Sequence, residues 1–166
     1  MREEVILVDK TDKPIGVMEK LEAHQKGFLH RAFSVFIFNH KGELLLQQRA
    51  LNKYHSAGLW TNTCCSHPRP NEDTLAAAHR RLMEEMGLET ELVHKTHFIY
   101  RTGFENGLIE HEFDHIYFGD CSQKPQINKN EVEAFVWMHP QKVILEINNT
   151  PEKYTSWFKI AMQKLF

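Results

Sequence analysis

Residues 71–88 carry a helix with clear signals at both of its ends. Asn71 can cap the helix, and Glu72 and Asp73 place negative charge in the first turn, where the helix dipole favours it. Gly87 stands where a glycine commonly ends a helix. Apolar residues recur between these ends at helical spacing, at Leu75, Ala78, Leu82 and Met86. The pattern therefore predicts a helix that starts after Asn71 and stops at Gly87.

The remaining elements are shorter and mixed in type. Segments with the composition of strands cover residues 5–9, 15–18, 32–39, 43–49, 92–100, 110–119 and 133–138. His40-Lys41-Gly42 gives a hairpin signal, with Gly42 suited to a positive φ. Pro140 and Pro151 can each open a helix, near 140–148 and 151–165, whereas residues 50–70 read as irregular. We therefore predict an α/β (α+β) fold with helices packed on a central mixed sheet.

Length and charge limit the classes of partner. A chain of 166 residues suits one domain, predicted over 1–166 with its core at about 29–163. Lys plus Arg is 20, Asp plus Glu is 22, and the net charge of −2 argues against nucleic acid as the main partner. The sequence has no secretory signal and no apolar stretch approaching the roughly 20 residues that span a bilayer. We therefore expect no membrane association.

Cysteine usage indicates the compartment. The chain has three cysteines, of which Cys64 and Cys65 are adjacent, so an odd count and this spacing do not suggest a disulfide framework. A reducing, cytoplasmic location is the natural expectation, with free thiols available for catalysis or metal binding.

The predicted helix also contains an acidic motif. Its pattern resembles the Nudix box, G-x5-E-x7-R-E-U-x-E-E-x-G-U, in which U is aliphatic. Seven positions fit the box, namely Glu72, Arg80, Leu82, Glu84, Glu85, Gly87 and Leu88. Such helices hold Mg²⁺ against a diphosphate, whereas Glu84-Glu85 alone would suggest only a solvated face. Ser66 replaces the leading glycine, and Arg81 replaces a glutamate, which favours a site that grips a diphosphate without cutting it.

Three histidines and two glutamates form a second candidate group. Glu110 and Glu112 are two apart on a predicted strand, so their side chains face the same way. His24 and His30 would lie about 240° apart on an ideal helix, so we expect them in a loop. His67 precedes the acidic helix. Each residue alone is weak evidence, but imidazole and carboxylate together suit Zn²⁺, Mn²⁺ or Fe²⁺.

The segment Trp60–Pro68 is the most specific motif. It resembles W-T-N-[S/T]-x-C-x-H-P, the signature of type 1 isopentenyl-diphosphate isomerases. Other segments typical of that family lie before and after this motif, in the expected order. The resemblance therefore covers about residues 5–160. It implies a Nudix-like α/β/α sandwich that interconverts isopentenyl and dimethylallyl diphosphate by metal-dependent allylic proton transfer. The partner would then be a small allylic or homoallylic diphosphate, and the protein a monomer or weak homodimer.

The resemblance assigns roles position by position. It implies Cys65, Glu112 and Tyr100 as catalytic residues, with Cys64 a bystander. The implied ligands of one Mn²⁺ or Zn²⁺ are His24, His30, His67, Glu110 and Glu112. Glu85 would bind Mg²⁺ together with the substrate diphosphate. The implied substrate-binding residues are Lys20, Arg49, Lys53, Arg81 and Trp157.

A double bond that moves by one carbon needs an acid on one side of the substrate and a base on the other. We expect Cys65 on one side, with Glu112 and Tyr100 on the other. Trp157 would offer a π face to the carbocation. The last helix, with Trp157 and Phe158, would act as a lid that keeps water out.

Two other functions compete with the isomerase. One is a Nudix hydrolase of a nucleoside diphosphate derivative, which predicts a full set of box acids and leaves Cys65 without a role. The other is a non-enzymatic domain with a closed structural metal site. Its ligands would come from Cys64, Cys65, His67, His24 and His30.

Overall fold

The computed structural model describes residues 2–166. Its strands are β1 (Glu4–Val8), β2 (Pro14–Glu19), β3 (His30–Phe38), β4 (Leu44–Arg49), β5 (Trp60–Thr61), β6 (Cys64–Ser66), β7 (Val93–Gly103), β8 (Ile109–Asp120) and β9 (Val132–Met138). The helices are α1 (Lys20–Lys26), α2 (Thr74–Met86), α3 (Pro140–Asn149), the short 3-10 helix η1 (Pro151–Lys153) and α4 (Ser156–Leu165).

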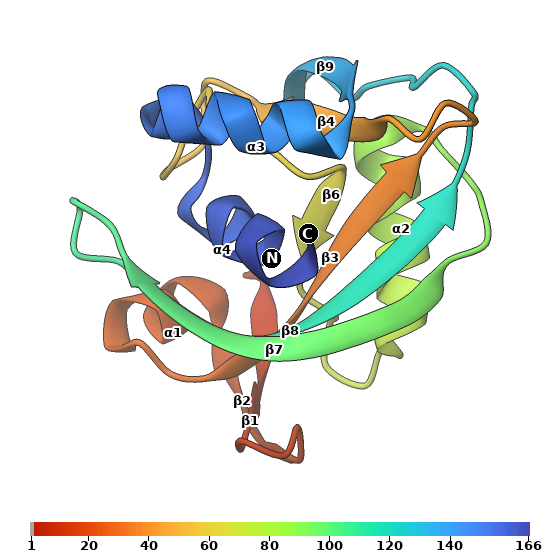
Figure 1. Cartoon of the computed structure of the whole chain (residues 1–166). Coiled ribbons are helices and arrows are strands. Elements are labelled where there is room, and N and C mark those ends of the chain that lie inside the picture. Colours follow the sequence, from red (N-terminus) through yellow and green to blue (C-terminus); the bar gives the residue numbers. More distant parts are fainter. Residues whose placement is uncertain (1) are drawn as a thin grey trace.

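Strand β3 is the centre of the sheet (Figure 1). It runs parallel to β8 along its whole length, and it pairs antiparallel with β1 and β6. Strand β8 continues into the antiparallel β7, while β4 pairs with β9 and β5. The sheet therefore mixes parallel and antiparallel strands, as predicted from the sequence.

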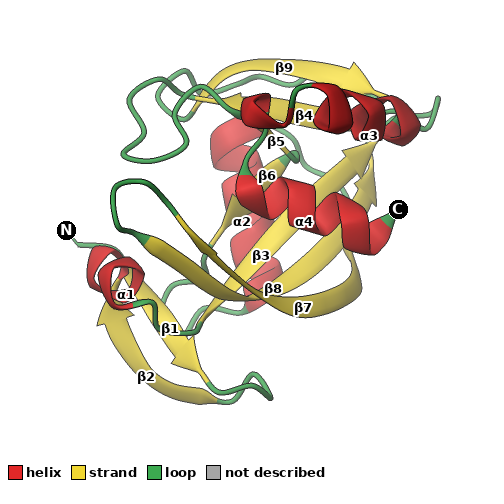
Figure 2. Ribbon diagram, turned by 60° about the vertical axis from the view of Figure 1, so that its left-hand side comes forward, coloured by secondary structure: helices red, strands yellow, loops and turns green. Residues whose placement is uncertain are grey.

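Helices cover both faces of this sheet (Figure 2). Alternate residues of β3 point to opposite sides. Phe33, Val35 and Ile37 pack in one core with Leu82 and Met86 of α2. A second core on the other side joins β3 and β4 to α3 and α4 through Phe36, Leu44, Val143, Phe158 and Ala161. The predicted α/β/α arrangement is confirmed.

Helix α2 starts two residues later than the sequence suggested. Its N-cap is Asp73, whose side chain accepts from the backbone N–H of Ala76, whereas Asn71 lies outside the helix with a φ of 66°. The predicted cap at Asn71 is therefore wrong, because Asp73 has the capping geometry. The predicted end is confirmed, since Gly87 has a φ of 64° and donates its N–H to the Met83 carbonyl.

Two other sequence-based boundaries differ from the structure. The region predicted as irregular contains the short strands β5 and β6. Pro151 opens a 3-10 turn, and α4 begins later, where Thr155 caps the backbone N–H of Phe158. The hairpin signal is confirmed, because Gly42 adopts a φ of 76° between β3 and β4.

Helix α1 contradicts the loop expected for His24. Glu19 caps its first turn, Glu22 and Lys26 form an i,i+4 ion pair of 2.6 Å, and Gly27 ends it at a φ of 69°. The helix stops before His30, which begins β3. The expectation of a loop is wrong because it assumed that His24 and His30 would belong to the same helix, whereas His24 lies in α1 and His30 in β3.

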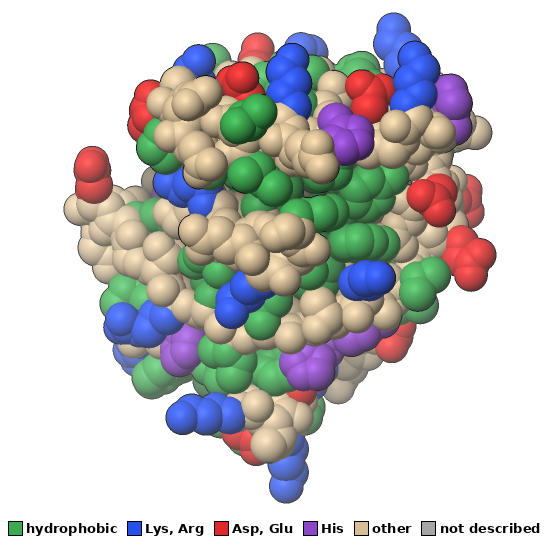
Figure 3. Space-filling model, viewed as in Figure 1, with side chains coloured by type: hydrophobic (Ala, Val, Ile, Leu, Met, Phe, Trp, Pro, Cys, Tyr) green, Lys and Arg blue, Asp and Glu red, His purple; other side chains and the backbone are tan. Residues whose placement is uncertain are grey.

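The surface carries a band of hydrophobic side chains across one face (Figure 3). No helix in residues 2–166 combines the length and the apolar character needed to cross a membrane. Cys64, Cys65 and Cys121 are all free thiols.

Candidate active site

The predicted site residues converge on one pocket. Its lining consists of Lys20, His24, Arg49, Lys53, Tyr54, His55, Cys65, Ser66, His67, Arg81, Glu85, Glu110, Glu112 and Trp157. Only His30 and Tyr100, among the residues assigned from the sequence, are absent from this lining. Both contact Glu112, so they lie immediately behind the pocket wall.

Glu112 is the geometric centre of the site. The sheet register places His30 of β3 opposite Glu112 on one side and Tyr100 of β7 opposite it on the other. Tyr100 Oη donates a short hydrogen bond to Glu112 Oε1. Glu112 Oε2 lies 2.7 Å from His67 Nε2 and 3.3 Å from His30 Nε2. Both carboxylate oxygens are therefore held by neighbouring side chains.

Three imidazoles gather around this carboxylate. The ring centroids of His24 and His67 are 5.8 Å apart, and His30 lies 5.0 Å from each. His24 Nδ1 lies 2.7 Å from the Lys20 carbonyl, and His30 Nδ1 lies 2.9 Å from the Phe28 carbonyl. Donation from Nδ1 to these carbonyls leaves each Nε2 lone pair free, which is the usual arrangement of a metal-binding histidine.

This donor set fits a divalent metal ion. Ligand atoms of His24, His30, His67 and Glu112 all lie within 4.8 Å of one another. No cysteine belongs to this group in the described residues, so the closed site of cysteines and histidines expected from the structural-metal alternative is not formed.

Glu110, the fifth ligand implied by the sequence, lies beside the group rather than in it. Glu110 Oε1 lies 2.9 Å from Tyr100 Oη, so the two glutamates share the one hydrogen of the Tyr100 hydroxyl. Glu110 Oε2 is buried and has no hydrogen-bond partner within residues 2–166. A buried carboxylate oxygen without a partner is costly, and a nearby cation would satisfy it.

The two glutamates have opposite electrostatic environments. Burial, reinforced by the negative charge of Glu112, raises the pKa of Glu110 well above its usual range. Burial also opposes the ionisation of Glu112, but His67 and His30 outweigh it and hold the pKa of Glu112 well below its usual range. Burial lowers the pKa of His67 to about 4, yet a neutral His67 can still donate Nε2–H to the carboxylate. The surroundings of Glu112 therefore favour its ionised form more strongly than those of Glu110 do.

Buried hydrogen bonds fix the strand that carries Cys65. Asn62 Nδ2 donates to the carbonyls of Val35 and Cys64, at 3.1 and 2.9 Å. Strand β6 then alternates, so that Cys64 enters the core beside α2 while Cys65 lines the pocket. Asn62 of the sequence signature therefore serves mainly to set this geometry.

The thiol of Cys65 contacts the indole of Trp157. Trp157 Nε1 donates to Cys65 Sγ at 3.2 Å, and Thr155 anchors the start of α4 by donating its backbone N–H to the Trp60 carbonyl at 3.0 Å. Burial raises the pKa of the Cys65 thiol above its usual value. Trp157 thus lines the pocket as expected, whereas Phe158 is fully buried in the core and is no part of a mobile lid.

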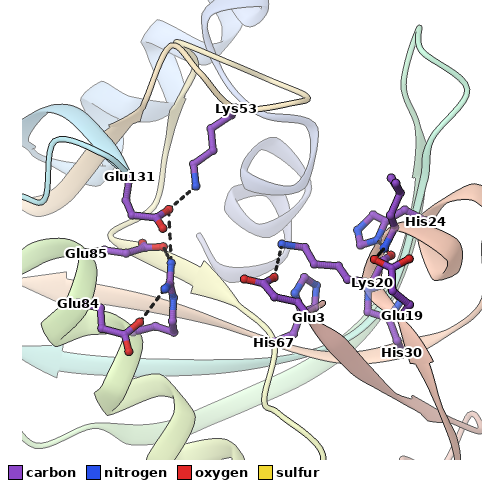
Figure 4. Close-up of polar contacts among 12 residues, drawn as sticks. Glu3, Glu19, Lys20, His24, His30, Lys53, His67, Glu84, Glu85 and Glu131 are labelled. Atoms are coloured by element: carbon purple, nitrogen blue, oxygen red, sulfur yellow. Dashed lines mark hydrogen bonds and ion pairs between the residues drawn. The ribbon is translucent and has the colours of Figure 1, made fainter. Parts of the chain in front are cut away.

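Four cations line the other end of the pocket, and Figure 4 shows two of them, Lys20 and Lys53, beside Glu3 and Glu131. Lys20 pairs with Glu3 at 3.0 Å, Lys53 with Glu131 at short distance, and Arg81 with Glu85 at 2.6 Å. The guanidinium of Arg49 lies 5.2 Å from the Trp157 ring centre. The Nε atoms of Arg49 and Arg81 are buried without acceptors among the described residues. Unmet donors beside several cations are suited to an anion.

Glu85 lies on the Arg81 side of the pocket, apart from the histidines. It is buried, and its second oxygen accepts from Gln47 Nε2 at 2.9 Å. In Figure 4 the acids Glu84, Glu85 and Glu131 stand on one side and His24 and His30 on the other. The site therefore has two separate carboxylate regions.

Comparison with known proteins decides the family. The NUDIX domain family matches residues 28–158. The isopentenyl-diphosphate Delta-isomerase of Pectobacterium atrosepticum is 54% identical over 162 residues, covering 98% of this chain and 90% of that protein. This chain belongs to the isopentenyl-diphosphate Delta-isomerase family. Its relative in Serratia proteamaculans is 53% identical, covering 99% of this chain and 92% of that protein. The family resemblance predicted from the motifs is confirmed.

Solved structures support the same fold. A protein from Deinococcus radiodurans superposes with a TM-score of 0.82, at 17% identity, over 99% of both chains. The dihydroneopterin triphosphate pyrophosphohydrolase of E. coli gives 0.59 at 15% identity, over 81% of this chain and 92% of that one. At such low identities the likeness concerns the Nudix fold alone.

The motifs of the isomerase family did not point to every pocket residue. Tyr54 and His55 line the pocket from the loop between β4 and β5, and Gln47 holds Glu85. The sequence offered one signal, since Tyr54 and His55 directly follow the cationic position Lys53. Burial, with nearby Arg49, lowers the pKa of His55 to about 3, so its imidazole is neutral at neutral pH.

Proposed function

We propose that this protein interconverts isopentenyl diphosphate and dimethylallyl diphosphate. The observation that carries the proposal is one pocket that combines Cys65 and Glu112 with four cations. The cations, two of which have a buried N–H without an acceptor among the described residues, are suited to bind the diphosphate. The two proton-carrying groups are suited to protonate and deprotonate the alkene. The names of relatives up to 54% identical agree with this activity.

The reaction requires a proton to be added at one end of an allylic unit and another to be removed at C2. Cys65 and the Glu112–Tyr100 pair are the two proton-handling groups. The raised pKa of Cys65 keeps its thiol protonated, while Tyr100 Oη directs its hydroxyl proton at the Glu112 carboxylate. The forward and reverse reactions use the same two groups in opposite order.

A tertiary carbocation forms between the two proton transfers. The indole of Trp157 is suited to stabilise it, since a desolvated cation–π contact is worth about 2 kcal/mol. Trp157 also donates to Cys65 Sγ, which keeps the ring beside one of the proton-handling groups. Water must be excluded, because it would trap the cation as an alcohol.

We further propose the metals. His24, His30, His67 and Glu112, with Glu110 adjacent, would hold one Mn²⁺ or Zn²⁺. Such an ion would fix the Glu112 carboxylate and tune its acidity. Glu85 would bind Mg²⁺ together with the diphosphate, while Lys20, Arg49, Lys53 and Arg81 neutralise the remaining charge.

The wider biological setting is also part of the proposal. We propose a cytoplasmic enzyme of isoprenoid biosynthesis, formed by a single domain and acting as a monomer or weak homodimer. Its partner is the small diphosphate substrate, with neither nucleic acid nor membrane involved. The three free thiols suit a reducing compartment.

Proton NMR of the purified protein with isopentenyl diphosphate, Mg²⁺ and Mn²⁺ or Zn²⁺ in heavy water tests the activity. We expect the methyl signals of dimethylallyl diphosphate, deuterium in the product and no free phosphate. Release of phosphate, or unchanged substrate with folded and metal-loaded protein, would refute the proposal.

A further inference from the structure

His55 occupies a position that no family motif explains. It lies in the loop between β4 and β5, and its side chain lines the pocket beside Trp157. Every other histidine of the pocket region, namely His24, His30 and His67, belongs to the cluster around Glu112. His55 therefore needs a different role.

The imidazole of His55 lies among four aromatic rings. It stacks on Phe104 with a centroid distance of 4.6 Å and an interplanar angle of 16°. It meets Trp157 edge to face at 5.8 Å and 88°, and Tyr54 at 4.7 Å and 87°. On a further side it stacks against His24 at 6.3 Å. Offset stacks and edge-to-face contacts are the favourable aromatic geometries.

These contacts join three segments that are distant in sequence. Phe104 belongs to the hairpin between β7 and β8, and Trp157 to the first turn of α4. Asn106 of the same hairpin donates its side-chain N–H to the Tyr54 carbonyl at 3.3 Å. Arg49 donates to the His55 carbonyl at 3.3 Å. The loop is therefore fastened to the hairpin and to the cationic wall through its backbone, which places the ring of His55 against Trp157.

We propose that His55 is a positioning residue, whose ring, stacked on Phe104, holds Trp157 in the orientation that meets Cys65 and closes this end of the pocket to water. The edge-to-face contact with His55 and the hydrogen bond from Nε1 to Cys65 Sγ together fix the indole of Trp157. This inference rests on the isomerase activity proposed above.

Three variants, His55→Ala, His55→Leu and His55→Phe, distinguish the effect of an aromatic ring from the effect of the imidazole nitrogen atoms. Alanine removes the side chain that contacts Trp157. Leucine restores its volume without an aromatic ring, and phenylalanine restores the ring without nitrogen atoms. We expect kcat to fall roughly tenfold in His55→Ala, since one or two aromatic contacts of this kind are lost. The KM should change less than threefold, because the four cations remain, and His55→Phe should recover most of kcat.

A second readout reports on water exclusion. When water attacks the tertiary carbocation, a C–O bond forms and one water proton leaves to solvent, which gives a tertiary alcohol diphosphate with no change in oxidation state. We expect this product, measured by NMR, to rise in His55→Ala and to a smaller extent in His55→Leu. A role limited to fold stability would not produce it.

His97→Ala is the matched control. His97 also stacks on a phenylalanine, Phe113, at 4.9 Å and 22°, but it does not line the pocket. We expect wild-type kcat and no alcohol from this variant. Thermal unfolding of each variant will show that it is folded at the assay temperature.

Three outcomes would overturn the inference. The first is a wild-type kcat and product ratio in both His55→Ala and His55→Leu, and the second is an equal loss in His55→Phe and His55→Ala. The third is a lower kcat in His55→Ala without any rise in the tertiary alcohol, which would refute the role in excluding water. Wild-type protein that converts no isopentenyl diphosphate would instead refute the proposed function, so the two failures are distinguishable.

Discussion

Neighbouring residues of the same type have different surroundings in this protein. Cys64 is fully buried in the core beside α2, whereas Cys65 lines the pocket. Arg80 binds Glu72 outside the pocket, whereas Arg81 lines it. Each pair provides a variant and its control one residue apart.

Cys65→Ala is expected to lower kcat by roughly 10³-fold or more, because it removes a positioned proton-transfer group. The control Cys64→Ala should keep kcat within twofold and cost about 1 kcal/mol of unfolding free energy through a small cavity. Steady-state kinetics and urea unfolding measure the two effects. Normal turnover in folded Cys65→Ala would remove the thiol from the mechanism.

Arg81→Gln should raise the KM for isopentenyl diphosphate roughly tenfold to a hundredfold, the usual value of a hydrogen bond to a charged group. Arg80→Gln loses a two-point contact with Glu72, at 2.8 Å for each bond, and should mainly reduce stability by about 1 kcal/mol or less. Equal KM values in the two variants would show that Arg81 does not bind the diphosphate.

The neutral state of His55 makes stability depend on pH. Its pKa is about 3 in the folded protein and near 6.5 when unfolded, so the folded state binds fewer protons between these values. Its contribution to stability is complete above pH 6.5 and decreases as the pH falls towards 3. We therefore measure the thermal unfolding midpoint of His55→Phe and of wild type at two pH values. The difference, variant minus wild type, should be larger at pH 4.5 than at pH 7.5. A difference independent of pH would contradict the buried, neutral imidazole.

The sequence was most informative about residues with fixed chemical partners. The resemblance to the isomerase family pointed to Cys65, Glu112 and the four cations, and all of these line one pocket. It could not find His55, because stacking between a loop and a distant hairpin leaves no periodic pattern. The sequence also led us to place Phe158 in a lid, because it does not show whether an aromatic residue beside Trp157 faces the pocket or the core.

At the scale of elements, the glycine that ends α2 was a more reliable signal than the predicted helix starts at Asn71 and Pro151. Gly87 ends α2 with a φ of 64°, and a Cβ atom there would lie 2.7 Å from the Gln126 carbonyl oxygen. By contrast, helix α1 has no apolar stripe that would reveal it, and is defined by the cap at Glu19 and the turn at Gly27. Its existence therefore had to come from capping, which the search for apolar periodicity does not detect.

Gly87→Ala is expected to destabilise the protein by about 2 to 4 kcal/mol, since backbone strain and a steric clash add. Gly42→Ala has a similar positive φ of 76° but meets no atom within 4 Å, so it should cost only about 1 kcal/mol. Urea unfolding of both variants measures the difference. Equal losses would mean that Gln126 moves away without cost.

At the scale of the whole molecule, the proposed metal ligands come from α1, β3, β8 and the loop before α2. Hydrogen bonds hold His24 and His30 to backbone carbonyls, and the sheet register holds Glu112. The surrounding cores do not include these ligands. The layered fold was predictable from the alternation of elements, whereas the position of β4 beside β9 was not, because that pairing is not local.

Removal of metal with a chelator should therefore abolish turnover without unfolding the protein. We expect an unchanged far-UV circular dichroism spectrum, a lower unfolding midpoint, and recovery of activity with Mn²⁺ or Zn²⁺. Unfolding at 25 °C upon chelation would instead indicate a structural metal.

The parallel pairing of β3 with β8 also has a consequence for folding. His30 and Glu112 face each other across this pair although 82 residues separate them in sequence. Contacts of such long range form late and slow the folding of small proteins. On the ribosome, His24, His30 and His67 emerge well before Glu112, so the complete set of donors cannot assemble until most of the chain has been synthesised. Loading of the proposed metal would thereby be confined to chains that have already formed the centre of the sheet.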